Sequence, residues 1–464
     1  MKGPWLTTFL AILLCGLGAY VYFVELPAER KKVETEAAEK QLIPFGRQDI
    51  TNLTLRSAGE TIVLAAAQDD PKDHKWKIAS PIQAEADPRE VEGLLRALTL
   101  GKVARVVEEK PSDLAAYGLA HPSAVLTLKA GSREETLSLG DSGPISSTLY
   151  AIRASDPKVL LTDLAAKDFL NKTVLTFRKK EVLPFEQNKV DRLRLTYPKH
   201  EIVLYRLENK WRIRAPIEAP ADPPAVRTLL LKLKDLKALS FIDPGPQHDA
   251  LLKTLKEPAA KITVHEGDRD RDSERTVKLF EPDPRSGEAY AVISPEGPIY
   301  RISPLSIKDL VRDLFVLQDK RLLGLERDEI AMLAVKTHEE QYQLIKQIDQ
   351  WVLEDLPTEK LNQQKVDLLV SRVVDLPAEL RVVKESRPLA PYGLSSPTAE
   401  FTATGKDGKR HGRLVLGTKV GGLAYAMGRG LRGIYQVRSD LLAQIPSKQD
   451  LLAKTLAPES KPSP

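Results

Sequence analysis

The chain has 464 residues, enough for about three domains of ordinary size, and its 42% hydrophobic and 29% charged residues are typical of a globular protein. The 69 basic residues exceed the 64 acidic ones by only five and are dispersed, which excludes the clustered Lys/Arg groove of a nucleic-acid-binding protein. A single cysteine, Cys15, excludes an intrachain disulfide and a cysteine-based zinc site, and the seven histidines stand singly, without metal-ligand spacing.

After a short segment, 1–4, the stretch 5–24 reads WLTTFLAILLCGLGAYVYFV and carries no charge. As a helix it would be ~30 Å long at ~1.5 Å per residue, which matches the hydrocarbon core of a bilayer. Aromatic residues at both ends suit the two membrane interfaces. These features predict an uncleaved transmembrane helix.

Two other interpretations of this stretch compete with an anchor. A cleaved signal peptide is the alternative, although the apolar run is longer than a usual signal core and no A-x-A-like site precedes Glu25. A lipoprotein signal at Cys15 needs a small residue where Leu14 stands. The uncleaved anchor is therefore favoured.

The side of the membrane is not decided by the flanking charges. Lys2 alone precedes the span, whereas four basic residues follow it by position 40, and local counting therefore favours a cytoplasmic location for the rest of the chain. Large folded regions, however, translocate largely regardless of such charges.

The stretch 25–43 is charged and helix-prone, with Lys32–Glu36 and Glu36–Lys40 spaced for i, i+4 pairing. It is interpreted as a solvated helical spacer between the bilayer and the first folded unit. The sharper alternative is a helix that docks on a partner's juxtamembrane segment. At the other end, the tail 457–464 is expected to be disordered.

After the spacer, one sequence pattern occurs three times. A strand-like group of apolar residues recurs with a step of 140 residues, and its copies are Phe45/Ile50/Leu53/Leu55, Phe185/Val190/Leu193/Leu195 and Leu325/Ile330/Leu333/Val335. A tryptophan follows in each copy, at Trp76, Trp211 and Trp351. Fifteen residues after each tryptophan begins an apolar stripe with i, i+3, i+4, i+7 spacing, which predicts an amphipathic helix.

Helix capping supports two of these three helices. Asp87-Pro88 and Asp222-Pro223 supply an N-cap followed by proline at the first helical position. The third copy lacks this pair. Alternating apolar residues and polar turns after each helix predict hairpins.

A phrase of eight residues also recurs, as AAYGLAHP at 115–122 and APYGLSSP at 390–397. The two copies share Tyr-Gly-Leu, which is Tyr117-Gly118-Leu119 in the first copy and Tyr392-Gly393-Leu394 in the second. We interpret the phrase as a structural joint, in which each glycine adopts a positive φ and the leucine enters the core. The middle copy keeps only Leu255 and Pro258, a loss that a joint tolerates better than a catalytic motif does.

The predicted fold is therefore α+β: an N-terminal transmembrane helix followed by three tandem repeats of antiparallel sheet plus one main helix. The predicted units are 44–184, 185–324 and 325–456.

Three motifs suggest chemistry, and each has a structural interpretation that is preferred. The sequence 428–433, GRGLRG, fits G-x-G-x-x-G but precedes a predicted strand, so it is interpreted as a hairpin turn. The aspartates at 268, 270 and 272 resemble the start of an EF-hand loop, but Ser273 and Leu279 occupy positions that need Gly and Glu. The three tryptophans could be ligand platforms but are interpreted as core residues.

The single hydrophobic span, together with W-x-I-x-x-P, A-D-x-x-x-V-x-x-L-L, Tyr-Gly-Leu-x-x-Pro, L-x-L-G and Tyr-Ala, resembles the domain-of-unknown-function 4340 (DUF4340) family of bacterial proteins. The resemblance covers nearly the whole chain after residue 44. The sequence departs from it where the second copy lacks Tyr-Gly and the third lacks Ala-Asp. The family offers no catalytic residues to carry over, and no catalytic, cofactor-binding or metal-ligating residue is assigned.

The resemblance implies a bacterial envelope protein grouped with ABC-type transport and gliding-motility-like components. We therefore expect a non-enzymatic accessory or scaffold protein, held in the inner membrane by 5–24 with the bulk of the chain in the periplasm. Its expected partners are membrane lipid and an inner-membrane complex such as an ABC-type permease. The alternative is a periplasmic module that binds a lipid, glycan or peptide between repeats.

Overall fold

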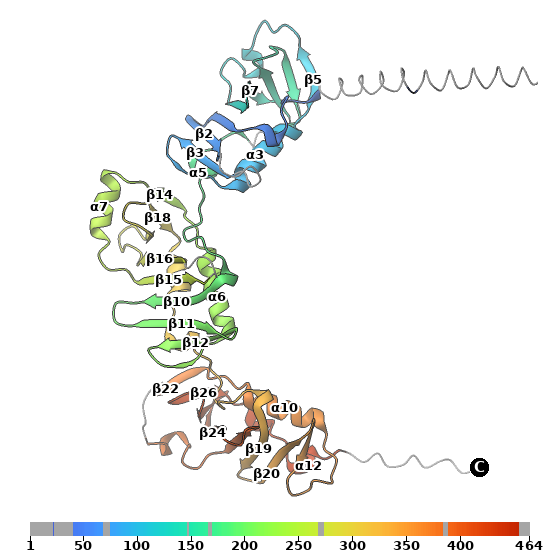
Figure 1. Ribbon diagram of the computed structural model, residues 1–464, viewed down its shortest axis with the longest axis vertical. Helices are drawn as coiled ribbons and strands as arrows, with labels where there is room; N and C mark the ends of the chain where they lie inside the picture. Colours follow the sequence, from blue (N-terminus) through green and yellow to red (C-terminus); the bar gives the residue numbers. More distant parts are fainter. Residues whose placement is uncertain are drawn as a thin grey trace, which may run out of the picture. The chain divides into compact units, whose positions relative to one another are not determined.

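The computed structural model describes residues 22, 40–67, 75–145, 148–165, 169–267, 273–383 and 388–453. Three antiparallel sheets follow one another along the chain, each with a few helices, so the fold is α+β and repetitive, as predicted (Figure 1). The chain divides into two compact units, one of residues 1–181 with 237–240 and one of residues 182–236 with 241–464. We call the three sheet-containing parts repeats 1, 2 and 3.

The predicted transmembrane helix, 5–24, lies outside the described residues apart from Tyr22. The same holds for most of the spacer, for the tail 457–464 and for the aspartates at 268, 270 and 272. In the part of the chain that the structure describes, no helix is both long and apolar enough to cross a membrane. The membrane span therefore stays a prediction.

Repeat 1 contains a nine-stranded sheet and one main helix, which connects the two edge strands of that sheet. Its strands are β1 (Asn52–Ser57), β2 (Glu60–Ala66), β3 (Trp76–Ser80), β4 (Ala84–Glu85), β5 (Val103–Glu108), β6 (Ala124–Ala130), β7 (Arg133–Ser142), β8 (Leu149–Arg153) and β9 (Val159–Thr162). They lie in the order β4-β3-β2-β1-β6-β7-β8-β9-β5, with antiparallel pairing throughout. The main helix α3 (Pro88–Leu100) runs between the two edge strands, β4 and β5.

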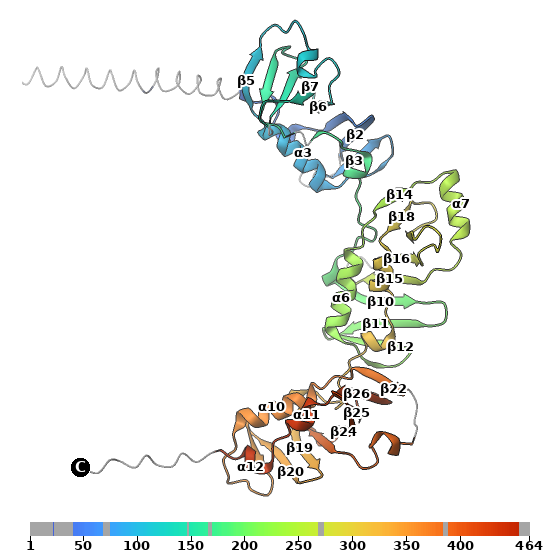
Figure 2. The same cartoon turned by 180° about the vertical axis from the view of Figure 1, so that it is seen from behind.

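Repeat 2 has the same strand order with one additional helix. Its strands are β10 (Val190–Thr196), β11 (Glu201–Leu207), β12 (Lys210–Ala215), β13 (Ala219–Pro220), β14 (Ser240–Ile242), β15 (Ala260–Glu266), β16 (Ser273–Phe280), β17 (Ala289–Val292) and β18 (Ile299–Ile302). The order is β13-β12-β11-β10-β15-β16-β17-β18-β14. The main helix α6 (Pro223–Lys234) lies beside β10, β11 and β12 in both Figures 1 and 2. The additional helix, α7 (Pro246–Thr254), follows β14.

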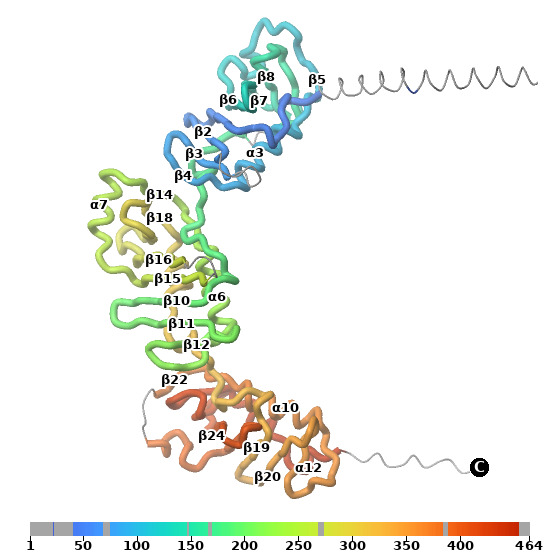
Figure 3. The backbone as a smooth tube through the Cα atoms, viewed as in Figure 1, coloured from blue at the N-terminus to red at the C-terminus, as the bar shows by residue number. Residues whose placement is uncertain are grey.

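Repeat 3 has eight strands in the corresponding order, β21-β20-β19-β23-β24-β25-β26-β22. They are β19 (Ile330–Thr337), β20 (Gln341–Gln347), β21 (Gln350–Leu353), β22 (Leu380–Val383), β23 (Ala399–Gly405), β24 (His411–Val420), β25 (Leu423–Gly428) and β26 (Ile434–Arg438). The main helix is α10 (Gln363–Val374), and a one-turn helix, α11 (Asp440–Ala443), follows the last strand. The path of the chain through the three repeats can be followed in Figure 3.

The three main helices form where the apolar stripes predict them and bury those stripes. The buried positions are Val91/Leu94/Leu95/Leu98, Val226/Leu229/Leu230/Leu233 and Val366/Leu369/Val370/Val373. Asp87 and Asp222 cap the first two helices by accepting from the backbone N–H of Arg89 and Ala225. In the third copy Asn362 takes over this role and accepts from Lys365 N–H, so an amide replaces the missing Asp-Pro pair.

Each repeat is closed by backbone bonds from its last helical turn to the start of its main helix. These turns are α5 (Val174–Phe177), α9 (Leu314–Leu317) and α12 (Lys448–Leu451). The closing bonds are Asp87 N–H to Phe177 O at 2.6 Å, Asp222 N–H to Leu317 O at 2.8 Å and Asn362 N–H to Leu451 O at 2.8 Å. Each turn also contributes one fully buried side chain to its own repeat; these are Phe177, Leu317 and Leu451.

Each Tyr-Gly-Leu phrase begins at the last residue of a 3₁₀ turn, Tyr117 in repeat 1 and Tyr392 in repeat 3. Gly118 and Gly393 have φ of +69° and +67°, and the leucines that follow each glycine are only 5% exposed. Each phrase packs on the glycine of the L-x-L-G strand: a Cβ at Gly140 would lie 2.1 Å from the carbonyl oxygen of Tyr117, and one at Gly417 would lie 2.2 Å from that of Tyr392. Only glycine permits this approach between the two backbones.

Repeat 2 has exchanged this joint for a different one. Phe280 stands in the place of Gly140 and Gly417, and it is buried together with Ile242, Tyr290, Val292 and Ile299. Leucines of α7 and the residue that follows it pack against this cluster; they are Leu251, Leu252 and Leu255. Repeat 2 therefore differs from the other two repeats by three changes that meet in one cluster. It lacks Tyr-Gly, it has the additional helix α7, and it has Phe280 in place of the glycine.

The tryptophans differ in burial. Trp76 and Trp351 are 2% and 3% exposed and belong to the cores of repeats 1 and 3. Trp211 departs from the expected core position, because it is only half-buried.

We predict that Trp76→Ala and Trp351→Ala each lower the free energy of unfolding by about 3–5 kcal/mol, because each leaves a cavity in a packed core. Trp211→Ala should cost only about 1 kcal/mol, because its ring is already partly solvated. Chemical denaturation of the full chain measures all three variants. Equal losses would show that Trp211 is a core residue after all.

Gly140→Ala should destabilise repeat 1 by about 1–3 kcal/mol, since the new methyl group would overlap the backbone of Tyr117. Gly93→Ala is the matched control in the same repeat. Gly93 lies within α3 and has open space where a Cβ would be, so alanine there should stabilise by about 0.5–1 kcal/mol. Thermal unfolding of both variants tests this, and a neutral Gly140→Ala would contradict the close approach.

Candidate functional site

Two histidines of repeat 2, His248 and His265, form hydrogen bonds within the repeat. His248 is buried, and its ring nitrogens bond to Asp249 at 2.9 Å and to the carbonyl oxygen of Gly297 at 3.0 Å. His265 bonds to Asp191 at 2.6 Å. Among the described residues, no three His, Cys, Asp or Glu side chains are grouped so that they could hold a metal ion.

The G-x-G-x-x-G sequence is a turn, as predicted. Gly428 ends β25, and β26 begins at Ile434. A Cβ at Gly428 would lie 2.1 Å from the carbonyl oxygen of Leu322, and Gly430 N–H donates to the same oxygen at 2.9 Å. These glycines therefore let the segment that leads into repeat 3 pack on the hairpin, which explains them without a phosphate.

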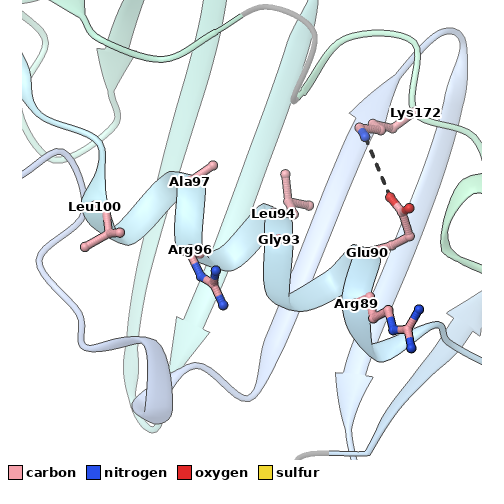
Figure 4. A pocket seen from close by; sticks show the side chains of 8 residues that line it. All are labelled: Arg89, Glu90, Gly93, Leu94, Arg96, Ala97, Leu100 and Lys172. Carbon is pink, nitrogen blue, oxygen red and sulfur yellow. Dashed lines mark ion pairs between the residues drawn. The ribbon is translucent and has the colours of Figure 1, made fainter. Parts of the chain in front are cut away.

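One hollow of about 420 Å³ lies along the outer face of α3 (Figure 4). Its lining residues are Arg89, Glu90, Gly93, Leu94, Arg96, Ala97, Leu100 and Lys172. The Lys172 ammonium lies 3.9 Å from the Glu90 carboxylate, and Figure 4 shows both arginines pointing away from this pair. The corresponding face of α6 contacts the helix α8 (Pro304–Leu310), and Lys232 of α6 pairs with Asp309 at 3.0 Å. Because its cations diverge, this hollow is a weak candidate.

A second hollow, of about 630 Å³, lies in repeat 2 and has the half-buried tryptophan in its wall. Its lining residues are Glu186, Gln187, Asn188, Arg206, Asn209, Trp211, Pro223, Arg227 and Lys234. They come from the 3₁₀ turn η4 (Gln187–Lys189), the hairpin of β11 and β12, and the helix α6. We call this hollow the Trp211 site.

An ion pair seen in the other two repeats is absent from the Trp211 site. In repeat 1, Arg47 of the equivalent 3₁₀ turn pairs with Glu92 of the main helix at 3.0 Å. In repeat 3, Arg327 pairs with Asp367 at 3.2 Å. The corresponding residues of repeat 2 are Gln187 and Arg227, which cannot pair as ions. The charge on the main helix is thus reversed at this position in repeat 2 alone.

The reversal makes the Trp211 site positively charged. Within the described ranges, Arg227 and Lys234 form no ion pair. Arg206 lies opposite Trp211 in the hairpin register, and one of its guanidinium N–H groups donates to the carbonyl oxygen of Asn188 at 3.0 Å. The one lining carboxylate, that of Glu186, is paired with the Lys189 ammonium at 3.1 Å. Three cations therefore face one carboxylate whose charge is already balanced.

The predicted repeat positions are best described repeat by repeat. Trp76 and Trp351 lie in the cores of their own repeats, and the two Tyr-Gly-Leu phrases form separate joints in repeats 1 and 3. Trp211 lines the hollow of repeat 2. Reasoning from the sequence missed its neighbours because the spacing from the tryptophan to the main helix is the same in all three copies. The signal that was available is the change of Arg47/Glu92 and Arg327/Asp367 to Gln187/Arg227 at aligned positions.

The comparison with known families matches the repeats one by one. The model described as "Domain of unknown function (DUF4340)" matches residues 76–212, 211–381 and 351–462, and each match begins at one of the three repeated tryptophans. The chain belongs to the DUF4340 family. The three matches confirm that this DUF4340 protein contains an internal repeat. No curated protein and no solved structure matches the chain.

A separate charged cluster, around Arg321, has a structural role. The Arg321 guanidinium donates to Asp319 at 2.5–3.1 Å and to both carboxylate oxygens of Glu326 at 2.6 Å. These bonds hold the pKa of the Glu326 carboxyl below its usual range, with a smaller contribution from the charge of Lys210. The cluster joins the end of repeat 2 to the first turn of repeat 3, so its charges stabilise the chain locally.

We predict that Arg321→Met lowers the free energy of unfolding by about 1–2 kcal/mol at neutral pH, a value reduced by the partial exposure of the cluster. Because the pKa of Glu326 is lowered by folding, its contribution is present above the unfolded value of about 4.3 and is lost as pH falls through the folded value. The stability difference between the variant and the native chain should therefore shrink in acid. Denaturation curves at pH 7 and pH 3 measure it, and an equal difference at both would contradict the assignment.

Proposed function

We propose that this DUF4340 protein is a non-enzymatic, membrane-anchored accessory or scaffold protein of a bacterial envelope transport complex of the ABC type. The observation that supports this best is the triplication of one closed α+β unit. Tandem copies of such a unit give a protein extended binding surfaces without requiring a catalytic centre. The grouping of the family with envelope transport components supports the same proposal.

The proposal includes an uncleaved inner-membrane anchor at 5–24 and a periplasmic location for the repeats. The anchor is supported by its uncharged length and aromatic ends. The periplasmic side is supported by the size of the region that follows and by the envelope association of the family, against the local count of basic residues. In this arrangement the span and the spacer 25–43 engage a permease laterally, and the repeats form a platform above it.

A second candidate function is supported by the Trp211 site. A half-buried aromatic ring beside cations without ion-pair partners is a feature of ligand-binding hollows. The protein would then be a periplasmic binding module. Its ligand would lie within repeat 2, rather than between repeats as the sequence alone suggested.

Protease added to intact spheroplasts should digest the repeats and leave the anchor in the membrane. A cytoplasmic marker protein that stays intact in the same sample is the control for sealed membranes. Protection of the repeats until the membrane is lysed would place them in the cytoplasm and contradict the periplasmic scaffold.

Purification of the full chain from native membranes should recover an inner-membrane transport complex. A matched variant in which 5–24 is replaced by an unrelated transmembrane helix separates the two contact modes. Loss of the complex in this variant would assign the contact to the native span, and retention would assign it to the repeats or the spacer. Recovery of no membrane complex with either chain would contradict the scaffold function.

A further inference from the structure

We propose that the Trp211 site binds an acidic saccharide, meaning a short glycan that carries a carboxylate or phosphate on its ring. This inference rests on the second candidate function, the binding module, and requires neither the anchor nor a transport complex. It is carried by the geometry of one hollow and by the comparison of three copies of the same unit within one chain.

The half-buried ring of Trp211 supplies a flat apolar face at the wall of the hollow. The equivalent rings in repeats 1 and 3 are almost fully covered, so the exposure is specific to repeat 2. A sugar ring presents aliphatic C–H groups on one face and hydroxyl groups at its rim. The indole surface can therefore cover the C–H face while the hydroxyl groups reach polar neighbours.

The cations supply the recognition of negative charge. Arg227 carries a planar guanidinium that fits a carboxylate or phosphate with two parallel hydrogen bonds. Lys234 lies seven residues further along α6, or ~10 Å at ~1.5 Å per residue. That separation is comparable to the length of a disaccharide, so the two cations can bind acidic groups on successive sugars.

The remaining lining residues suit hydroxyl groups. Gln187, Asn188 and Asn209 each carry an amide that both donates and accepts, as a hydroxyl group does. Asn209, in the tight turn between β11 and β12, has a φ of +65° and belongs to the lining of the hollow. The volume of about 630 Å³ lies within the range of about 300–1,000 Å³ usual for small-molecule sites. The spacing of Arg227 and Lys234 favours a saccharide with acidic groups on successive sugars over a mononucleotide, which carries a single phosphate group.

The ion pair of repeats 1 and 3 can be introduced into repeat 2 as a variant that fills the Trp211 site. In both, an arginine on the 3₁₀ turn pairs with a carboxylate on the main helix. The double variant Gln187→Arg/Arg227→Glu gives repeat 2 the same pair at the same positions. It should close the site without loss of stability, which separates a binding defect from a folding defect.

Isothermal titration of the full chain in detergent tests the proposal, with a glucuronic-acid-containing disaccharide as the probe. The neutral glucose disaccharide and adenosine monophosphate are the comparison ligands. The acidic disaccharide should bind at least about tenfold more tightly than either, and both Trp211→Ala and the double variant should weaken it at least about tenfold. Trp76→Phe, in the closed equivalent of repeat 1, should leave the binding unchanged.

Circular dichroism melts establish that each variant is folded before it is titrated. Three results would overturn the proposal: no binding of the acidic disaccharide at millimolar concentration, binding that neither Trp211→Ala nor the double variant weakens, or tighter binding of adenosine monophosphate that depends on Trp211. Failure of this titration would leave the scaffold proposal standing, because that proposal is tested on membranes and does not involve the Trp211 site.

Discussion

The backbone bond that joins the last helical turn of each repeat to the start of its main helix is the constraint on which the rest of the fold depends. The main helix connects one edge strand of the sheet to the other, so the position of its first turn determines where the chain crosses between the two edges. In each copy that first turn is held twice, by its own N-cap and by the carbonyl group of Phe177, Leu317 or Leu451. Every repeat can therefore complete its own core, and its surface is free to diverge.

Repeat 2 shows how far that divergence goes. Its joint has been rebuilt around Phe280 and α7, whereas repeats 1 and 3 keep the approach of two backbones at glycine. Its ion pair between the 3₁₀ turn and the main helix has been replaced by Gln187 and Arg227. The strand order is unchanged by either substitution. The middle copy has thus kept the architecture and altered the places where a ligand or partner could be recognised.

The sequence predicted the features that depend on local chemistry. Apolar spacing located the three main helices, Asp87 and Asp222 marked two of their starts, and the positions of Gly118 and Gly393 indicated a positive φ. It did not indicate Asn362 as the third cap, because a lone asparagine carries a weaker signal than Asp-Pro. It did not distinguish Trp211 from Trp76 either, because the exposure of a ring depends on which side chains pack over it in the folded chain, and the sequence spacing around the two tryptophans is the same. The strand order could not be predicted from the sequence either. The two strands on either side of the main helix lie at opposite edges of the sheet, and the sequence contains no periodic pattern that indicates this.

Amide hydrogen exchange at Asp87, Asp222 and Asn362 is the most direct test of the claim that each repeat closes on itself. The account predicts that these three amides exchange only when their own repeat unfolds globally, as slowly as amides of the central strands β1, β10 and β19. Exchange at the fast rate of a fraying helix end, while the central strands stay protected, would show that the closing bonds do not hold the repeats together and would contradict the account.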